Sequence, residues 1–206
     1  TEFDISQTSQ SVIHINITTG DIVTFTEVTS EGEYTRLSLP GFHLSRDVGE
    51  PELPEIHSLI EIPQNAEPRI EIIGSNYRDY SLAEFGIENF IYPAQPSLSK
   101  SQNSDDIPFT INTDSYLKNT MLAKELISVT IEGQLRAIRI ANLNIRLVNY
   151  NPEENIIRVY TSLDINIHMD YADFTKTEEI KDAYYSPYFE AIYNQIPNYE
   201  STFRSN

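Results

Sequence analysis

The chain has 206 residues, of which 39% are hydrophobic, and its formal net charge is -17 at pH 7. The hydrophobic content is sufficient for a core, so wholesale disorder is excluded and a single domain over residues 1–206 is expected. Binding to nucleic acid or to an anionic membrane surface requires clustered Lys and Arg, and the strong acidity disfavours both roles. With 0 cysteines, the chain has no disulfide, no thiol nucleophile and no Cys-ligated metal.

Alternation of apolar and polar residues is the dominant pattern along the chain, and it predicts antiparallel strands. The predicted strands cover residues 12–17, 22–28, 33–39, 58–62, 69–73, 126–132, 137–147 and 156–169. Turn residues separate several of them, at 19–21, 30–33, 132–134 and 149–155. Weak helical patterns occur at 114–124 and 186–196, with Pro187 in a first turn. The sequence therefore predicts an all-β fold, an antiparallel β-sandwich of about ten strands with a short C-terminal helix.

The middle of the chain, residues 92–108, interrupts this pattern with three prolines and four serines and is predicted to be a long, irregular, exposed loop. Lys100, one of only five lysines, lies at its centre between Ser99 and Ser101, and Leu98 precedes them. A peptidase cleft binds an extended segment of this kind with one side chain in its primary pocket. A solvated loop lysine without a function is the other interpretation.

Residues that would support catalysis or metal binding are not arranged for either purpose. The four histidines, at positions 14, 43, 57 and 168, have no partner at metal-ligand spacing, and two of them fall in predicted strands. The acidic pairs at 105–106, 153–154 and 178–179 lack the alternating oxygens and the Gly of a calcium loop. We therefore expect a non-catalytic domain with no metal and no cofactor.

Export is compatible with the sequence only if a signal peptide has already been removed. Residues 1–4, Thr-Glu-Phe-Asp, lack the basic and apolar layout of a signal, and no apolar run approaches 18 residues, so no membrane insertion is expected.

One alternative is a stand-alone β-sandwich module that binds carbohydrate or acts as an adhesin of a surface protein, which would need exposed aromatic residues. Tyr184 and Tyr185 are candidates. The residues at 188, 189, 192 and 193 have helical spacing and are predicted to face the core instead.

Four segments, 47–63, 92–109, 133–151 and 186–195, resemble in order and spacing the N-terminal prodomain of the gingipain-type cysteine peptidases, most closely the lysine-specific branch. The resemblance runs from about residue 25 to the C-terminus. It implies a β-rich domain that assists the folding of a caspase-like catalytic domain, its partner, and blocks the active-site cleft. It also implies secretion through the periplasm to the surface or exterior of a Gram-negative bacterium.

The resemblance further assigns two sites. Lys100 occupies the position of the basic residue that enters the primary specificity pocket, with Leu98, Ser99 and Ser101 as the flanking loop. Residues 198–206 resemble the junction with the catalytic domain, where Arg204 is the expected processing site. Cuts after Lys176 or Lys181 are the alternatives.

Overall fold

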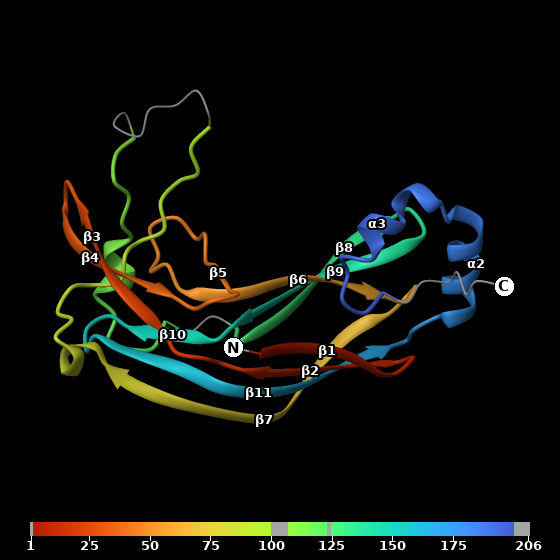
Figure 1. Ribbon diagram of the computed structural model, residues 1–206, viewed down its shortest axis with the longest axis horizontal. Coiled ribbons are helices and arrows are strands. Elements are labelled where there is room, and N and C mark those ends of the chain that lie inside the picture. The colour runs from red at the N-terminus through yellow and green to blue at the C-terminus, as the bar shows by residue number, and fades with distance from the viewer. Residues whose placement is uncertain (1, 100–106, 123–124, 200–206) are drawn as a thin grey trace.

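The computed structural model describes residues 2–99, 107–122 and 125–199, and within them eleven strands form three antiparallel sheets (Figure 1). The strands are β1 (Glu2–Ser9), β2 (Val12–Thr18), β3 (Val23–Thr29), β4 (Gly32–Ser38), β5 (His43–Leu44), β6 (Pro54–Ile62), β7 (Glu67–Ser81), β8 (Ile127–Leu135), β9 (Ile138–Arg146), β10 (Val148–Asn151) and β11 (Ile156–Asp170). The helices are η1 (Leu82–Phe85), α1 (Thr113–Tyr116), α2 (Phe174–Tyr184), η3 (Pro187–Phe189) and α3 (Glu190–Tyr193). The all-β prediction is confirmed.

The 15-residue strand β11 organises the larger sheet. On one edge it pairs with β7 along its whole length, and on the other it pairs first with β10 and then with β2, which in turn pairs with β1. Strands β5, β6, β9 and β8 form a second, four-stranded sheet, and β3 and β4 form a separate hairpin.

The two larger sheets bury a common aliphatic core, as the alternation of strands 12–17 and 156–169 predicts. Its fully buried members include Ile15, Ile60, Leu143, Ile145 and Ile165, from β2, β6, β9 and β11. Burying each of these side chains contributes about 1.5–3 kcal/mol. This core defines the sandwich.

A second buried cluster lies beneath the long loop. It joins Leu37 of β4 and Val159 of β11 to Ile91 and Tyr116, which flank the loop on either side. The base of the loop is therefore part of the hydrophobic interior and not an appendage to it.

Several strand predictions need correction. β7 extends to Ser81, although only residues 69–73 alternate, because β11 supplies a partner along all of it. β1, β5 and β10 were not predicted, and β10 occupies the first part of the expected turn at 149–155. The expected turn at 132–134 is a bulge inside β8 at Gly133, whose φ of +124° suits glycine, and the chain turns instead at Arg136.

The helical predictions were partly wrong. Only Thr113–Tyr116 of the segment 114–124 is a helix in the described chain, and the longest helix, α2, was missed. The side chain of Asp173 caps α2 by accepting the N–H of Lys176 at 2.9 Å. The predicted C-terminal helix is present as η3 and α3, with Pro187 in its first turn. None of the described helices is long and apolar enough to cross a membrane.

The C-terminal segment is attached to the free edge of β6 through one side chain. Asn198 accepts the backbone N–H of Glu61 and donates to the carbonyl oxygen of the same residue, both at 2.8 Å, so that its amide takes the place of a neighbouring strand. Nearby, Lys181 of α2 forms an ion pair with the side chain of Glu61 at 2.7 Å.

Replacing Asn198 by Ala should lower the free energy of unfolding by about 1–3 kcal/mol, because two buried backbone groups of Glu61 lose their partner. Urea denaturation measures the effect. Asn194→Ala, at an exposed position of the same segment, is the matched control and should change stability by less than about 0.5 kcal/mol. Equal losses in the two variants would show that the Asn198 contact adds nothing.

Candidate functional site

The described parts of the long loop form two stems, residues 92–99 and 107–112, which project from the end of the molecule that carries β3, β4 and α1 (Figure 1). The predicted exposed loop begins later than expected, because residues 92–94 are buried. Exposure starts at Ser97, and Leu98 at the top of the first stem is 49% exposed.

The first stem is held on both sides by backbone hydrogen bonds. Tyr92 donates to the carbonyl oxygen of Thr35 in β4, and Ala94 donates to that of Glu50, each at 2.8 Å. The N–H groups of Gly49 and Glu52 return bonds to Ala94 and Tyr92 at the same distance. Residues 92–94 thus behave as a short strand between β4 and residues 49–52.

The second stem is fastened to the first through the side chain of Gln95. Its amide nitrogen donates to the carbonyl oxygen of Thr110, and its amide oxygen accepts the N–H of Thr110, both at 2.9 Å. The N–H of Asn112 also donates to Gly49 at 2.9 Å. The loop is therefore closed at its base, and its two stems are fixed relative to each other. We call residues 49–52, 92–95 and 109–112 the loop base.

Aromatic rings pack around this base. Phe109 of the second stem lies 5.3 Å from Tyr34 and 5.9 Å from Tyr92, measured between ring centroids. The hydroxyl of Tyr116 donates to the carbonyl oxygen of Ile91 at 2.7 Å. Burial raises the pKa of Tyr116, so the hydroxyl keeps the proton that it donates.

Arg36 of β4 joins the base to the β3–β4 hairpin. Its guanidinium lies 3.9 Å from the centroid of the Tyr92 ring and forms ion pairs with Glu52 at 2.9 Å and Glu27 at 3.2 Å. Burial raises the pKa of Glu52, an effect that Arg36 opposes. These contacts fix the loop base to the β3–β4 hairpin through charged side chains.

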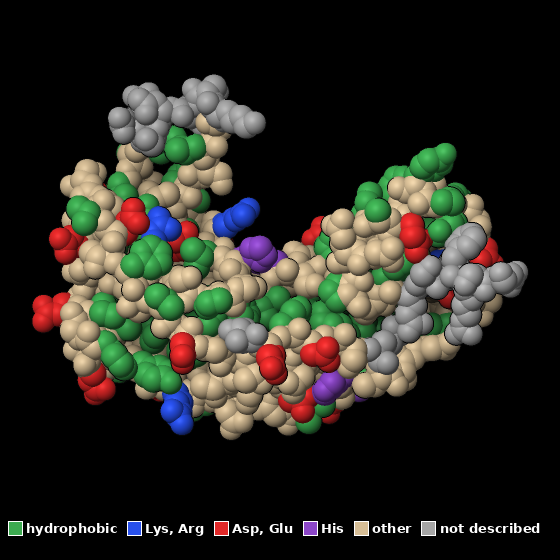
Figure 2. Space-filling model, viewed as in Figure 1, with side chains coloured by type: hydrophobic (Ala, Val, Ile, Leu, Met, Phe, Trp, Pro, Cys, Tyr) green, Lys and Arg blue, Asp and Glu red, His purple; other side chains and the backbone are tan. Residues whose placement is uncertain are grey.

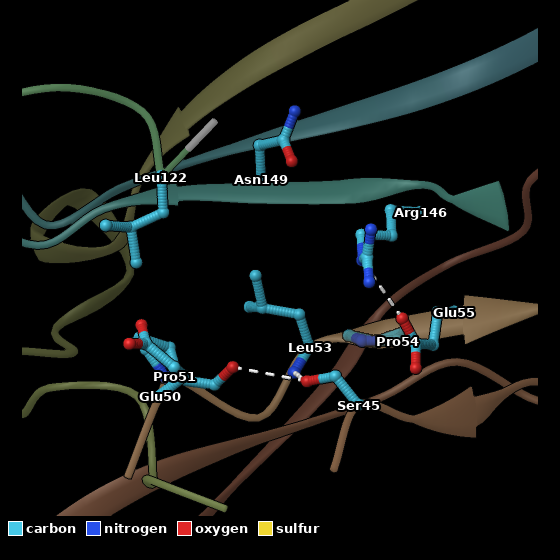
Figure 3. A pocket seen from close by; sticks show the side chains of 9 residues that line it. All are labelled: Ser45, Glu50, Pro51, Leu53, Pro54, Glu55, Leu122, Arg146 and Asn149. Atoms are coloured by element: carbon cyan, nitrogen blue, oxygen red, sulfur yellow. Dashed lines mark hydrogen bonds and ion pairs between the residues drawn. The ribbon is translucent and has the colours of Figure 1, made fainter. Parts of the chain in front are cut away.

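A small hollow lies beside the base, lined by nine residues that include Ser45, Glu50, Leu53 and Asn149 (Figure 3). Ser45 accepts the N–H of Leu53 at 3.0 Å, and Arg146 and Glu55 form an ion pair at 3.2 Å. The enclosed volume of about 20 Å³ has room for one water molecule, so the hollow is no ligand site.

Of the predicted site residues, Leu98 and Ser99 lie at the top of the first stem, and Lys100, Ser101 and Arg204 lie outside the described residues. No role was predicted from the sequence for the residues that hold the loop, above all Gln95, Gly49 and Arg36. The sequence Gly49-Glu50-Pro51 could have indicated a turn at this position. It could not have shown that Asn112, which is distant in sequence, contacts Gly49.

Three of the four histidines contact carboxylates: His14 and His168 do so across paired strands, and His57 does so within β6, where Glu55 is two residues earlier. His168 lies 2.6 Å from Glu71, His57 lies 2.6 Å from Glu55, and His14 lies 3.3 Å from Asp164. For His14 and His168, the carboxylate partner lies on a neighbouring strand and could not be found from spacing along the sequence. Within the described residues, no group of three or more His, Asp or Glu side chains is arranged to hold a metal ion.

Gly49 is required where the two stems meet, which gives a direct test of the loop base. A Cβ at position 49 would lie 3.0 Å from the backbone nitrogen of Asn112, whereas a Cβ at Gly41 would meet nothing within 4 Å. Both residues have a positive φ, +83° and +89°, so alanine at either position costs about 1–2 kcal/mol. Gly49→Ala should cost about 1–3 kcal/mol more through overpacking.

Thermal and urea unfolding of Gly49→Ala and Gly41→Ala measure this difference. If the two variants are equally stable, the contact between residues 49 and 112 does not constrain the loop.

The sequence and the fold both match known proteins. The sequence model of the Propeptide_C25 family matches residues 4–205. Lys-gingipain of Porphyromonas gingivalis is 35% identical over 170 residues, which cover 82% of this chain and 10% of that protein. Gingipain R2 of the same species is 24% identical over 186 residues, covering 88% of this chain and 24% of that protein.

Two solved structures share the architecture. One, which concerns the zymogenic latency of gingipain K from Porphyromonas gingivalis, has a TM-score of 0.77 at 27% identity, covering 83% of this chain and 93% of that one. The other is a complex of the pro- and mature domains of RgpB from Porphyromonas gingivalis, with a TM-score of 0.75 at 19% identity and coverage of 97% and 98%.

The sandwich with its projecting loop is thus the fold of a peptidase prodomain. The chain belongs to the Propeptide_C25 family and is a prodomain of the gingipain type, a part that is not itself the peptidase. It spans about a tenth of the length of the Lys-gingipains that it matches.

Proposed function

We propose that this domain keeps a gingipain-type cysteine peptidase latent by placing Lys100 in the primary specificity pocket, and that it assists the folding of the catalytic domain. The observation that carries the proposal is the closed loop base, which fixes the two stems, residues 92–99 and 107–112, relative to each other. A loop whose two ends are held in place before binding loses less conformational entropy when it enters a cleft. Ser99 and Ser101 keep the flanks small enough for such a cleft.

The comparisons support this choice of partner. The RgpB prodomain forms a complex with its mature domain, and a similar complex is the natural assembly for a chain of the same fold. The greater identity with Lys-gingipain than with Gingipain R2 favours a lysine-selective partner. Family membership also favours a prodomain over a carbohydrate-binding or adhesin module. As part of a gingipain-type precursor, the domain is expected to be exported through the periplasm of a Gram-negative bacterium.

Lys100→Ala should weaken inhibition of the mature peptidase by roughly 30-fold to several thousand-fold. A lysine-selective pocket pairs the ammonium group with a carboxylate away from water, and truncating one member of such a pair costs about 2–5 kcal/mol. Lys100→Arg should lose less but remain weaker than the parent, since the planar guanidinium does not reproduce a compact ammonium group. Inhibition constants of the purified variants measure both effects.

Lys118→Ala is the matched control, because Lys118 is an exposed lysine outside the loop base. It should leave inhibition unchanged, and thermal unfolding should show that all three variants are folded. A folded Lys100→Ala domain that inhibits within twofold of the parent would exclude insertion of this lysine.

We also propose that processing occurs after Arg204. Of the alternatives, Lys181 lies within α2 and its side chain is 11% exposed and paired with Glu61, and Lys176 lies in the first turn of the same helix. A peptidase binds its substrate in extended form, so a helical bond is a poor substrate.

Arg204→Gln should slow the separation of the two domains, and the mature enzyme should begin at Ser205. N-terminal sequencing of the mature peptidase decides the point. Any other first residue would refute the assignment, and a start at residue 177 or 182 would instead indicate that α2 unfolds before the cut.

A further inference from the structure

The side of the molecule from which the loop stems project is concave. The stems stand at one end and the arm that carries α3 stands at the other, with β5 and β6 between them (Figure 1). The space-filling view shows this surface as a hollow, with basic and His side chains along its floor (Figure 2). A catalytic domain whose cleft the loop enters lies next to the stems, and this hollow is a described surface beside them.

The floor of the hollow contains one arginine that the domain itself does not use. A depression of about 490 Å³ is lined by eight residues, among them His43, Arg46, Asp47, Glu55 and Arg146. Glu55 is buried and already paired with His57 at 2.6 Å and Arg146 at 3.2 Å. Arg46 is exposed, and no hydrogen bond or ion pair joins it to another described residue.

The far arm presents apolar side chains to solvent. Tyr188 is 93% exposed and Ile192 is 46% exposed, and their spacing of four residues places them on one face of the η3–α3 turn. The prediction that both face the core is therefore wrong. Tyr193 serves the core instead: it is fully buried against Ala137 and Ile138.

The buried cluster of the far arm does not include Tyr188. Phe189 and Tyr199 pack on Tyr193 from either side, with ring centroids 6.1 and 5.2 Å away. Tyr188 thus adds nothing to the packing of its own arm. Tyrosine and arginine are also the residues most often found at the energetic centres of protein interfaces.

We propose that Arg46, together with Tyr188 and Ile192, forms a second docking surface for the same catalytic domain, separate from the loop. The inference rests on the proposed function for the identity of the partner. The partner should present a carboxylate to Arg46 and an apolar patch to Tyr188 and Ile192. With the loop at one end and this surface across the floor and the far arm, the two domains meet at two linked contacts.

Two linked contacts change the strength of inhibition. When one contact opens, the other keeps the two domains together at high effective concentration, so the first contact re-forms before the domains separate. A loop excluded from the pocket would then leave a weaker but still specific complex.

The test measures the dissociation constant of the full 206-residue chain for the catalytic domain of the same precursor, in two forms. In the first form the nucleophilic cysteine is replaced and the pocket is open. In the second form a covalent lysyl inhibitor fills the pocket. Arg46→Ala and Tyr188→Ala should each weaken binding about tenfold or more in both forms. Lys100→Ala should weaken binding only to the open form.

Arg78→Ala and Tyr171→Ala are the matched controls. Arg78 is an exposed arginine on β7, at the opposite side of the molecule (Figure 1), and Tyr171 is 80% exposed where β11 meets α2. Both should leave binding unchanged in either form, and circular dichroism should show that all variants are folded.

The outcomes separate the two proposals. If Lys100→Ala weakens binding to the open form while Arg46→Ala and Tyr188→Ala match the controls, the second surface is wrong and the role of the loop stands. If Arg46→Ala and Tyr188→Ala weaken binding to both forms while Lys100→Ala matches the controls, the second surface is supported and the pocket assignment is wrong. Sedimentation of this chain alone tests a further outcome. If the parent is a dimer, Tyr188→Ala is a monomer and binding to the peptidase is unchanged, the surface binds a second copy of this chain and the inference is overturned.

Discussion

The pairing of residues 92–94 with β4 on one side and residues 49–52 on the other determines what this domain can present to a partner. Four backbone hydrogen bonds of 2.8 Å join Tyr92 and Ala94 to their neighbours, and Gln95 carries the connection to the second stem. Because Ile91 and Tyr116 belong to the hydrophobic interior, the loop cannot shift without disturbing the core. The two stems of the loop are thus held by the same contacts that stabilise the fold.

Much of the architecture follows from local patterns, because a strand with one buried face must alternate. This is why the strands around Ile15, Leu143 and Ile165 were predicted. The second half of β7 could not be predicted from the sequence, since Asn76, Arg78 and their neighbours are polar and only the long partner strand β11 makes them regular. The helix α2 was missed because its exposed surface leaves little apolar periodicity, and only Thr177 is buried among its residues.

The candidate site, too, could be predicted from the sequence only in part. The proline and serine content of residues 92–108 marks a loop, and the resemblance assigns it a role. The contacts that hold the loop join residues that are far apart in sequence: Gln95 with Thr110, Gly49 with Asn112, and Arg36 with Glu52. Nothing local distinguishes a glutamine that fastens two stems from any other glutamine. The exposed position of Tyr188 was missed for the opposite reason, since helical spacing shows which residues share a face but not whether that face is covered.

The amide of Asn198 on the edge of β6 has a consequence for the timing of activation. It makes the last side-chain hydrogen bonds to the sheets within the described residues, so a cut after Arg204 lies beyond it and leaves every described contact of the domain intact. Such a cut would remove the covalent link without loosening the prodomain. In a precursor cut at this point, the two domains would be held before the cut at a local concentration that no dilution can change, and after the cut their association would depend on the concentration of both. Latency would then persist where the precursor is crowded and end once the products diffuse apart, so that dilution, not unfolding, becomes the trigger.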